Sequence, residues 1–187
     1  NKYQKVPKDV ACKMRKPLAR LAENGSIHNR LSLSSLFNPD ICGPASLLLG
    51  LLFPEDVSMA KITQMLRGDV NLIGVAVELL AQRKEESSLL LFSALSQHKN
   101  YEVQKAVVSG LVKWILEGVI PDESFALLKE IVADASVRLT SAISLIVYQY
   151  PHSDAAERIL GLLEEKDYAV IPRHLEIVKT KWEKEES

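Results

Sequence analysis

The amino-acid sequence predicts an all-α fold, an α-solenoid (superhelix) of about five helical hairpins plus a C-terminal capping helix. One observation behind this prediction is an apolar residue that recurs at intervals of 31 to 34 residues. A second is a short polar residue three positions before most of these apolar residues. A third is that no segment shows the alternation of apolar and polar residues that is typical of strands. A single domain over residues 1–187 is expected. Its repeats cover residues 7–37, 38–68, 69–99, 100–133 and 134–166, with a final helix at 167–182 and disorder at 183–187.

The recurring apolar residues are expected in the first turn of the first helix of each repeat. These anchors are Val10, Ile41, Leu72, Val103, Val137 and Val170. Three positions earlier stand Pro7, Asn38, Asp69, Asn100, Asp134 and Asp167. An Asn or Asp side chain at the N-cap accepts a hydrogen bond from a free backbone N–H, which stabilises a helix by about 1 kcal/mol. Positions four and eight after each anchor share one helix face and are expected to pack against neighbours. These packing positions are Met14, Leu18, Ala45, Leu49, Ala76, Leu80, Val107, Leu111, Ser141, Leu145, His174 and Val178.

A second apolar-periodic run follows each first helix, so each repeat is expected to consist of a helix, a turn and a helix. The second helices are expected at residues 26–37, 57–67, 86–98, 122–133 and 153–165. Helix breakers stand in the turns, as at Gly118 followed by Pro121. Pro44 and Pro172 fall inside predicted first helices, where the missing backbone N–H should kink or delay the helix.

The first helices resemble those of the HEAT repeat family, in particular its short variant in phycobilisome-lyase-like proteins. The shared pattern is Asp-x-x-Val-Arg-x-x-Ala-x-x-x-Leu, and residues 134–145 match it best, with Ala142 one place late. Residues 100–107 match less well because Gln104 replaces the Arg of the family. The resemblance implies a solenoid that binds a partner, with the second helices lining the concave surface. Bilin attachment follows from this analogy alone, and nothing in the sequence specifies a chromophore pocket.

The polar positions of the second helices are therefore the candidate partner-binding residues. They are Asn29, Ser32, Lys61, Gln64, Ser93, Gln97, Lys129, Glu130, Arg158 and Glu165. This set is mixed in charge and contains no aromatic residue, which favours a protein segment over a nucleic acid. We therefore expect a non-catalytic protein–protein interaction scaffold that binds a partner segment on its concave face.

A basic patch at the N-terminus is the basis of an alternative function. It comprises Lys8, Lys13, Arg15, Lys16, Arg20 and Arg30. Such a cluster could bind phosphate groups, as in a nucleic-acid-binding module or an enzyme like the HEAT-like DNA glycosylases. It could equally be the solvated face of a terminal repeat. The whole chain has no basic excess, since 23 Lys and Arg residues face 24 Asp and Glu residues.

The titratable residues do not form a recognisable catalytic or metal-binding motif. The four histidines, each in a separate repeat, are His28, His98, His152 and His174. None is followed directly by a Glu, whereas HEAT-like deoxyhypusine hydroxylases bind iron through adjacent His-Glu pairs. His174 is expected to be a hydrogen-bonded interface residue. No serine lies in a nucleophile elbow, and there is no glycine-rich phosphate loop. We therefore expect no metal, no cofactor and no enzymatic activity.

The remaining features concern the compartment and the core. Cys12 and Cys42 are expected to be small core residues of a protein in a reducing compartment, the cytoplasm or nucleus. No signal peptide and no transmembrane helix are expected, since the longest apolar stretch is about nine residues. The apolar run 89–92 is expected to be buried between helices, with an exposed groove as the alternative. Trp114 and Trp182 are expected in packing or end-capping positions.

Overall fold

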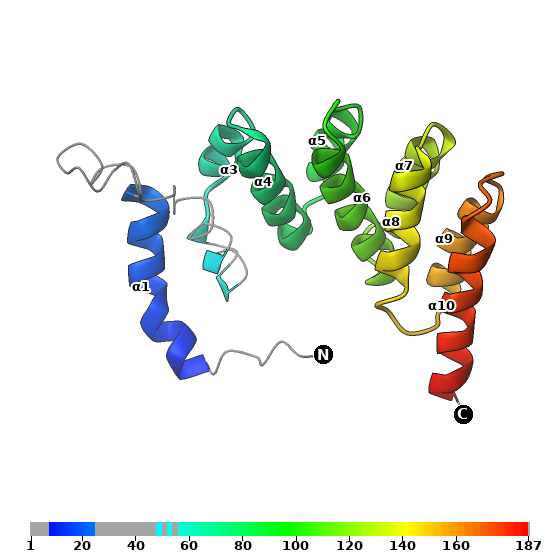
Figure 1. Ribbon diagram of the computed structural model, residues 1–187. Coiled ribbons are helices and arrows are strands. Elements are labelled where there is room, and N and C mark those ends of the chain that lie inside the picture. Colours follow the sequence, from blue (N-terminus) through cyan, green and yellow to red (C-terminus); the bar gives the residue numbers. More distant parts are fainter. Residues whose placement is uncertain (1–7, 25–47, 50–51, 54–55, 187) are drawn as a thin grey trace, which may run out of the picture. The chain divides into compact units, whose positions relative to one another are not determined.

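The computed structural model describes residues 8–24, 48–49, 52–53 and 56–186, and within these ranges it contains helices and no strand. The predicted all-α class is therefore confirmed (Figure 1). The chain falls into two compact units, residues 1–83 and residues 84–187. A single domain over 1–187 stays a prediction.

The N-terminal unit contains α1 (Lys8–Asn24), α3 (Met59–Met65) and α4 (Val70–Arg83). Helices α3 and α4 pack against each other. They match the second helix of the second predicted repeat and the first helix of the third. The expected helix at 26–37 and Pro44 lie outside the described residues, as does most of the first helix of the second repeat. Buried side chains of α3 and α4 include Ile62, Met65, Ala76, Val77 and Leu80.

The C-terminal unit contains six helices. They are α5 (Ser88–Ser96), α6 (Tyr101–Leu116), α7 (Pro121–Ala133), α8 (Val137–Val147), α9 (Asp154–Glu164) and α10 (Ile171–Glu186). Helix α8 packs between α6 and α10, which forms the α6/α8/α10 layer, and α7 packs between α5 and α9, which forms the α5/α7/α9 layer (Figure 1). The two layers enclose the core of this unit, where Phe92 and Trp114 lie with ring centroids 5.1 Å apart.

Two predicted N-caps are present as predicted. The Asp69 carboxylate accepts hydrogen bonds from the backbone N–H groups of Asn71 and Leu72, at 2.9 and 3.0 Å. The Asn100 side chain accepts one from Glu102 at 2.8 Å. Helices α4 and α6 therefore begin where the anchor register places them.

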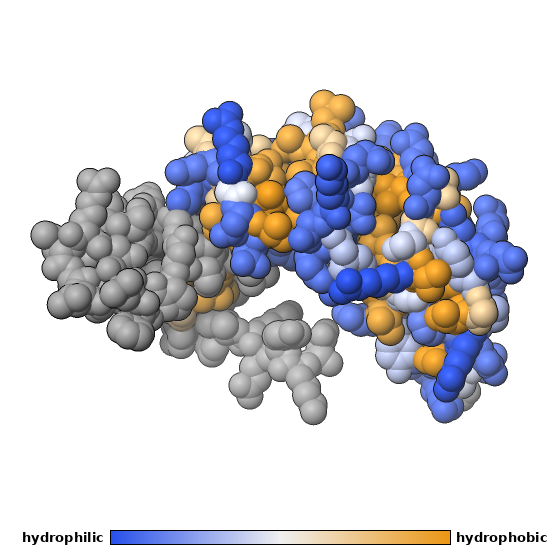
Figure 2. All heavy atoms as spheres, turned by 45° about the horizontal axis from the view of Figure 1, so that its top comes forward, coloured by the Kyte–Doolittle hydropathy of each residue, from blue (hydrophilic) through white to orange (hydrophobic). Residues whose placement is uncertain are grey.

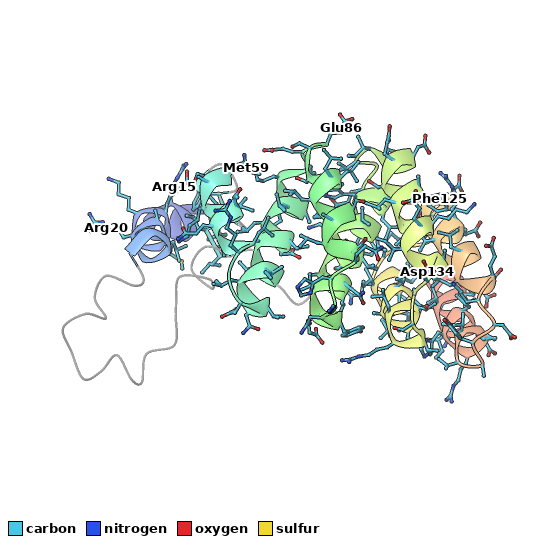
Figure 3. All side chains as sticks on the ribbon, turned by 90° about the horizontal axis from the view of Figure 1, so that it is seen from above. Arg15, Arg20, Met59, Glu86, Phe125 and Asp134 are labelled. Carbon is cyan, nitrogen blue, oxygen red and sulfur yellow. The ribbon has the colours of Figure 1, made fainter. Side chains whose placement is uncertain are left out.

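The other two described N-caps differ from the prediction. Asp134 is the C-cap of α7, and the Ser136 hydroxyl caps α8 instead by accepting a hydrogen bond from Leu139 N. The reason is that α7 continues to Ala133, which leaves Asp134 too close to the preceding helix to start the next one (Figure 3). Asp167 is likewise not a cap, because α10 begins only at Ile171. Pro172 is its second residue, so the predicted delay at this proline is confirmed.

The cap of α8 can be tested by substitution. We expect Ser136→Ala to lower the free energy of unfolding by about 1 kcal/mol, because Leu139 N loses its acceptor. Asp134→Ala should change it by less than about 0.5 kcal/mol, as at most exposed positions. Urea unfolding followed by circular dichroism measures both. A larger loss for Asp134→Ala than for Ser136→Ala would contradict the observed start of α8.

Helix α6 ends at the predicted breaker. Gly118 has a φ of +70°, which glycine adopts without steric cost. Its N–H donates to Ile115 O at 3.2 Å, and Val119 N–H donates to Trp114 O at 2.8 Å. This pair of bonds is the Schellman motif, which satisfies carbonyls left free at the helix end. The chain then enters α7 through Pro121 at its first position.

Helix α10 continues to Glu186, whereas disorder was expected from residue 183. Two interactions hold its last turns. Lys181 lies 3.3 Å from Glu185 one turn later, and the Trp182 Nε1–H donates to Tyr150 O at 3.1 Å. The Trp182 side chain is only 4% exposed, so the predicted end-capping role fits its position.

The packing stripe of α8 is rotated relative to the prediction. In α4 and α6 the predicted positions Ala76, Leu80, Val107 and Leu111 are all fully buried. In α8 the buried residues instead include Leu139, Ile143 and Val147, and Leu145 is 60% exposed. Leu145 follows Ile143 by two residues, or about 200° around the helix, so the two side chains point in nearly opposite directions. The predicted core position of Leu145 is wrong.

Candidate interaction surface

Most predicted partner-binding residues of the C-terminal unit lie on the outer side of the α5/α7/α9 layer. Exposed positions on this side are Ser93, Gln97, Lys129, Glu130, Arg158 and Glu165. The α7 and α9 helices are mainly acidic there, with Asp122, Glu123, Glu130, Asp154 and Glu157 against Lys129 and Arg158. In the N-terminal unit, Gln64 is exposed and Lys61 half-buried on α3. Asn29 and Ser32 lie outside the described residues.

Arg158 makes contacts that stabilise the fold. Its guanidinium carbon lies 4.4 Å from the centroid of Phe125, which Figure 3 labels, and its Nη1 lies 3.7 Å from an Asp122 oxygen. Both contacts connect α9 to α7. A partner that used Arg158 would compete with these contacts, so this residue is a weaker candidate than the neighbouring Lys129.

One member of the predicted basic patch has an acidic partner. The Nε and Nη2 atoms of Arg15 donate to the Asp56 carboxylate at 2.6 and 2.5 Å, and the guanidinium lies 4.7 Å from the centroid of Phe53. The hydrogen bond from Arg15 lowers the pKa of Asp56 below its usual value, against the opposing effect of burial. Arg15 therefore presents little uncompensated charge to a ligand.

The rest of the basic patch is partly described. Lys13, Lys16 and Arg20 are exposed on α1, as Figure 3 shows for Arg20. Lys8 is the first residue of α1, and Arg30 lies outside the described residues.

Two further residues test expectations about the core. Cys12 is exposed, so its expected burial is wrong. It precedes the buried Leu18 by six residues, which places it about 120° away around α1. Cys42 lies outside the described residues. His174 is half-buried, and its Nδ1 lies 3.2 Å from Ser144 Oγ, as expected for a hydrogen-bonded interface histidine.

The apolar run of α5 is buried only in part. Phe92 is fully buried, whereas Leu90 is 79% exposed. The expected burial of the whole run is therefore wrong, because a helix in one layer has a side that faces solvent. Figure 2 shows apolar side chains between charged ones over the C-terminal unit, drawn at the right.

Exposed apolar side chains from two neighbouring helices meet on the α6/α8/α10 layer. Leu145 of α8 and the C-cap residue Tyr148 are 60% and 39% exposed, and Ile177 of α10 is 49% exposed. Together with Ser144, His174 and Val178, they line a small pocket of about 90 Å³. We call Leu145, Tyr148 and Ile177 the apolar triad.

A larger groove of about 540 Å³ adjoins this pocket and shares Tyr148 and Ile177 with it. Its charged lining residues are Arg173, Lys181, Lys184, Glu176 and Glu185. Arg173 and Lys184 are exposed, and neither has an ion-pair partner among the described residues. Glu185 is paired with Lys181. The groove therefore presents two unpaired cations beside the apolar triad, against one unpaired acid, Glu176.

Hydrogen bonds hold the floor of this surface in place. Lys181 Nζ donates to the carbonyls of Tyr148 and Tyr150, at 2.7 and 3.2 Å, and lies 5.1 Å from the centroid of the Tyr148 ring. These bonds connect the segment that follows α8 to the C-terminal half of α10. The surface is therefore formed before any partner arrives, which lowers the entropic cost of binding.

Sequence reasoning missed this surface because it placed Leu145 in the core. The signal that could have located it is Ala142, one place late in the repeat pattern of residues 134–145. A displaced small residue indicates that the helix is rotated relative to the other first helices. That rotation exposes Leu145.

Comparisons of this chain with family models, curated proteins and solved structures found no match. Among the residues that the structure describes, no group of three or more His, Cys, Asp or Glu side chains could hold a metal ion. No helix in these ranges has the length and apolar character needed to cross a membrane.

Proposed function

We propose that this chain is a non-catalytic protein–protein interaction scaffold built as a HEAT-like α-solenoid. The observation that carries this proposal is the apolar triad, which lies exposed on adjacent helices beside a preformed groove. Exposed apolar residues that gather on one face, rather than scatter singly, are typical of interaction sites.

Contacts that recur at a fixed spacing support the repeat architecture. Lys166 Nζ donates to Ala133 O, and the Tyr168 hydroxyl donates to Ala135 O at 2.8 Å. The Arg158–Phe125 and Lys181–Tyr148 contacts connect the next pairs of helices. Each of these four contacts joins residues 33 positions apart, which is one predicted repeat length. A repeat whose residues bind the equivalent residues of the previous repeat can propagate as a stack.

The apolar triad is large enough to anchor a partner. Full burial of a Leu or Ile side chain is worth about 1.5 to 3 kcal/mol, and these residues still expose roughly half of their surface. Aromatic residues such as Tyr148 are enriched among the residues that dominate binding energy at protein interfaces. Binding through this surface alone should therefore be moderate, with additional contacts made elsewhere on the scaffold.

The exposed second-helix residues remain a proposed secondary contact area, with Lys129 and Glu130 at its centre. Binding of nucleic acid through α1 has narrower support. Among the patch residues whose side chains the structure describes, it rests on Lys13, Lys16 and Arg20, because Arg15 is paired with Asp56. A protein that holds a duplex through its phosphates typically makes more contacts than three cations supply.

Site-specific photo-crosslinking in native lysate tests the proposal. A photo-reactive phenylalanine analogue replaces Ile177 in one variant and Lys129 in another, and mass spectrometry identifies the products. We expect a protein adduct at position 177 that Leu145→Ser removes, because this exposed residue contributes to the surface and not to the core.

The Lys129 variant is the matched control on the other layer. An adduct at 129 with none at 177 would place the partner on the second helices, against the surface proposed here. Nucleic acid recovered with the chain, without any protein adduct at either position, would contradict the scaffold function itself.

A further inference from the structure

We infer that the groove between α8 and α10 binds an amphipathic helical segment of another protein, apolar in its middle and acidic at both ends. This inference rests on the proposed scaffold function and names the chemistry of the partner. It follows from where the apolar and charged side chains of the two helices lie relative to one another.

The apolar part of the segment is specified by the apolar triad. Leu145 lies in the last turn of α8 and Tyr148, three residues later, is the C-cap of that helix; Ile177 of α10 lines the same small pocket. An apolar side chain of the partner that enters this pocket would contact all three residues. Apolar residues spaced three or four apart on a helix present such a stripe, as in other helix-in-groove complexes.

The acidic ends are specified by two cations on α10. Arg173, Ile177 and Lys184 lie along the same side of the helix and line the same groove. Arg173 and Lys184 are eleven residues apart, which corresponds to about 16 Å along the helix axis, or three turns. The unpaired cations therefore flank the apolar centre, and carboxylates about three turns apart on a partner would reach both.

The charges of the two layers favour the same partner. Helix α8 has no acidic residue, and the only acid of α6, Glu102, lies 3.5 Å from Arg138 and 3.9 Å from Lys105. The four Glu residues of α10 are balanced by one Arg and three Lys, so the excess of positive charge in this layer comes from α6 and α8. The α5/α7/α9 layer is acidic on its outer side. An acidic segment is thus attracted to the α6/α8/α10 layer and repelled by the other, and this difference selects the binding face.

Nucleic acid and anionic membranes fit this surface less well. Two unpaired cations are few compared with the six to ten phosphate contacts, roughly, that a DNA-binding protein makes. The groove also includes the exposed acid Glu176, which would repel a phosphate backbone or an anionic lipid surface. A peptide can place its carboxylates away from this residue, whereas a uniformly charged surface cannot.

The experiment uses a phage library of random peptides of about 16 residues, a length that spans about four helical turns. The library is selected on the whole chain and counter-selected on a Leu145→Ser/Ile177→Ser variant. Fluorescence anisotropy then measures the affinity of the enriched peptides for Arg173→Glu/Lys184→Glu. The matched control is Arg67→Glu/Lys99→Glu, which makes the same change in net charge at exposed positions outside the groove and outside the secondary contact area. Circular dichroism confirms that each variant is folded.

We expect enriched peptides with apolar residues at helical spacing and Asp or Glu at both ends. Arg173→Glu/Lys184→Glu should weaken their binding by about tenfold or more, and the control by less than about twofold. Replacing the peptide carboxylates with Lys should restore binding to Arg173→Glu/Lys184→Glu, a gain that a damaged fold would not produce.

Three results would overturn the inference: no enrichment over the counter-selecting variant, enrichment of peptides without acidic residues, or equal effects of the two charge reversals. Vesicles of phosphatidylserine and phosphatidylcholine and labelled single-stranded DNA are tested in parallel. If the vesicles or the DNA bound the whole chain but not the groove variants, and no peptide were enriched, the occupant of the groove would be a membrane or a nucleic acid and not a peptide. If any of these results occurred while a protein adduct still formed at position 177, the proposed scaffold function would be retained. Only the inference that the partner is an acidic amphipathic segment would be rejected.

Discussion

Trp114→Ala should lower the free energy of unfolding of the C-terminal unit by about 3 to 5 kcal/mol, the usual cost of removing a fully buried aromatic side chain. Trp114 lies in α6, has no solvent exposure, and packs against Phe92 of α5. Helix α6 also contacts α7, α8 and α9, so a cavity at this position affects a helix that packs against helices of both layers. Urea unfolding monitored by circular dichroism gives the change.

Two controls separate the cavity from other effects of the substitution. Trp114→Phe keeps an aromatic ring against Phe92 and should cost only about 1 to 2 kcal/mol. Leu90→Ala removes an apolar side chain of the same unit from a position that is 79% exposed, and should change stability by less than about 0.5 kcal/mol. Equal losses for Leu90→Ala and Trp114→Ala would show that the two layers do not enclose the core described here.

Trp182→Ala should lower the free energy of unfolding by about 3 kcal/mol and loosen the contact between α8 and α10. The substitution removes a side chain that is 4% exposed and leaves the carbonyl of Tyr150 with one donor fewer. The ring also packs against His152, with centroids 5.0 Å apart. Hydrogen exchange should show the largest loss of protection in α10, because that helix has no further helix of the described unit beyond it.

Trp182→Phe separates ring packing from the hydrogen bond. It retains most of the apolar contact and loses the bond to Tyr150, so it should cost about 1 kcal/mol. If Trp182→Ala left both stability and the exchange of α10 unchanged, the last turns of this helix would have no part in holding α10 against α8.

The repeat register could be predicted from the sequence at α4 and α6, whereas Asp167 does not cap α10, which begins only at Ile171. Asp69 and Asn100 are the caps of α4 and α6, and Ala76, Val107 and Leu111 are buried as predicted. The register failed at α8, where Asp134 and Ser136 can both cap a helix. Periodicity does not choose between them, because the choice depends on how far α7 extends.

The candidate surface was less predictable than the fold. Its apolar members look like core residues in the sequence, and Leu145 fits the packing stripe of the repeat pattern. Exposure depends on which side of α8 faces α6, and a difference of one or two residues turns a side chain by about 100° to 200°. Arg15 illustrates the same limit for charges, since its partner Asp56 lies 41 positions away along the chain.

The amino-acid sequence by itself determined the helical class, the spacing of the helices and most of their ends, because caps, breakers and apolar periodicity act over a few residues. The tertiary structure decided that Ser136 rather than Asp134 starts α8, and that Leu145, Tyr148 and Ile177 share an exposed face. It also decided that Trp182 anchors a helix that continues to Glu186. These outcomes depend on contacts between helices about one repeat apart, and local propensities contain no information about the rotation of one helix against the next.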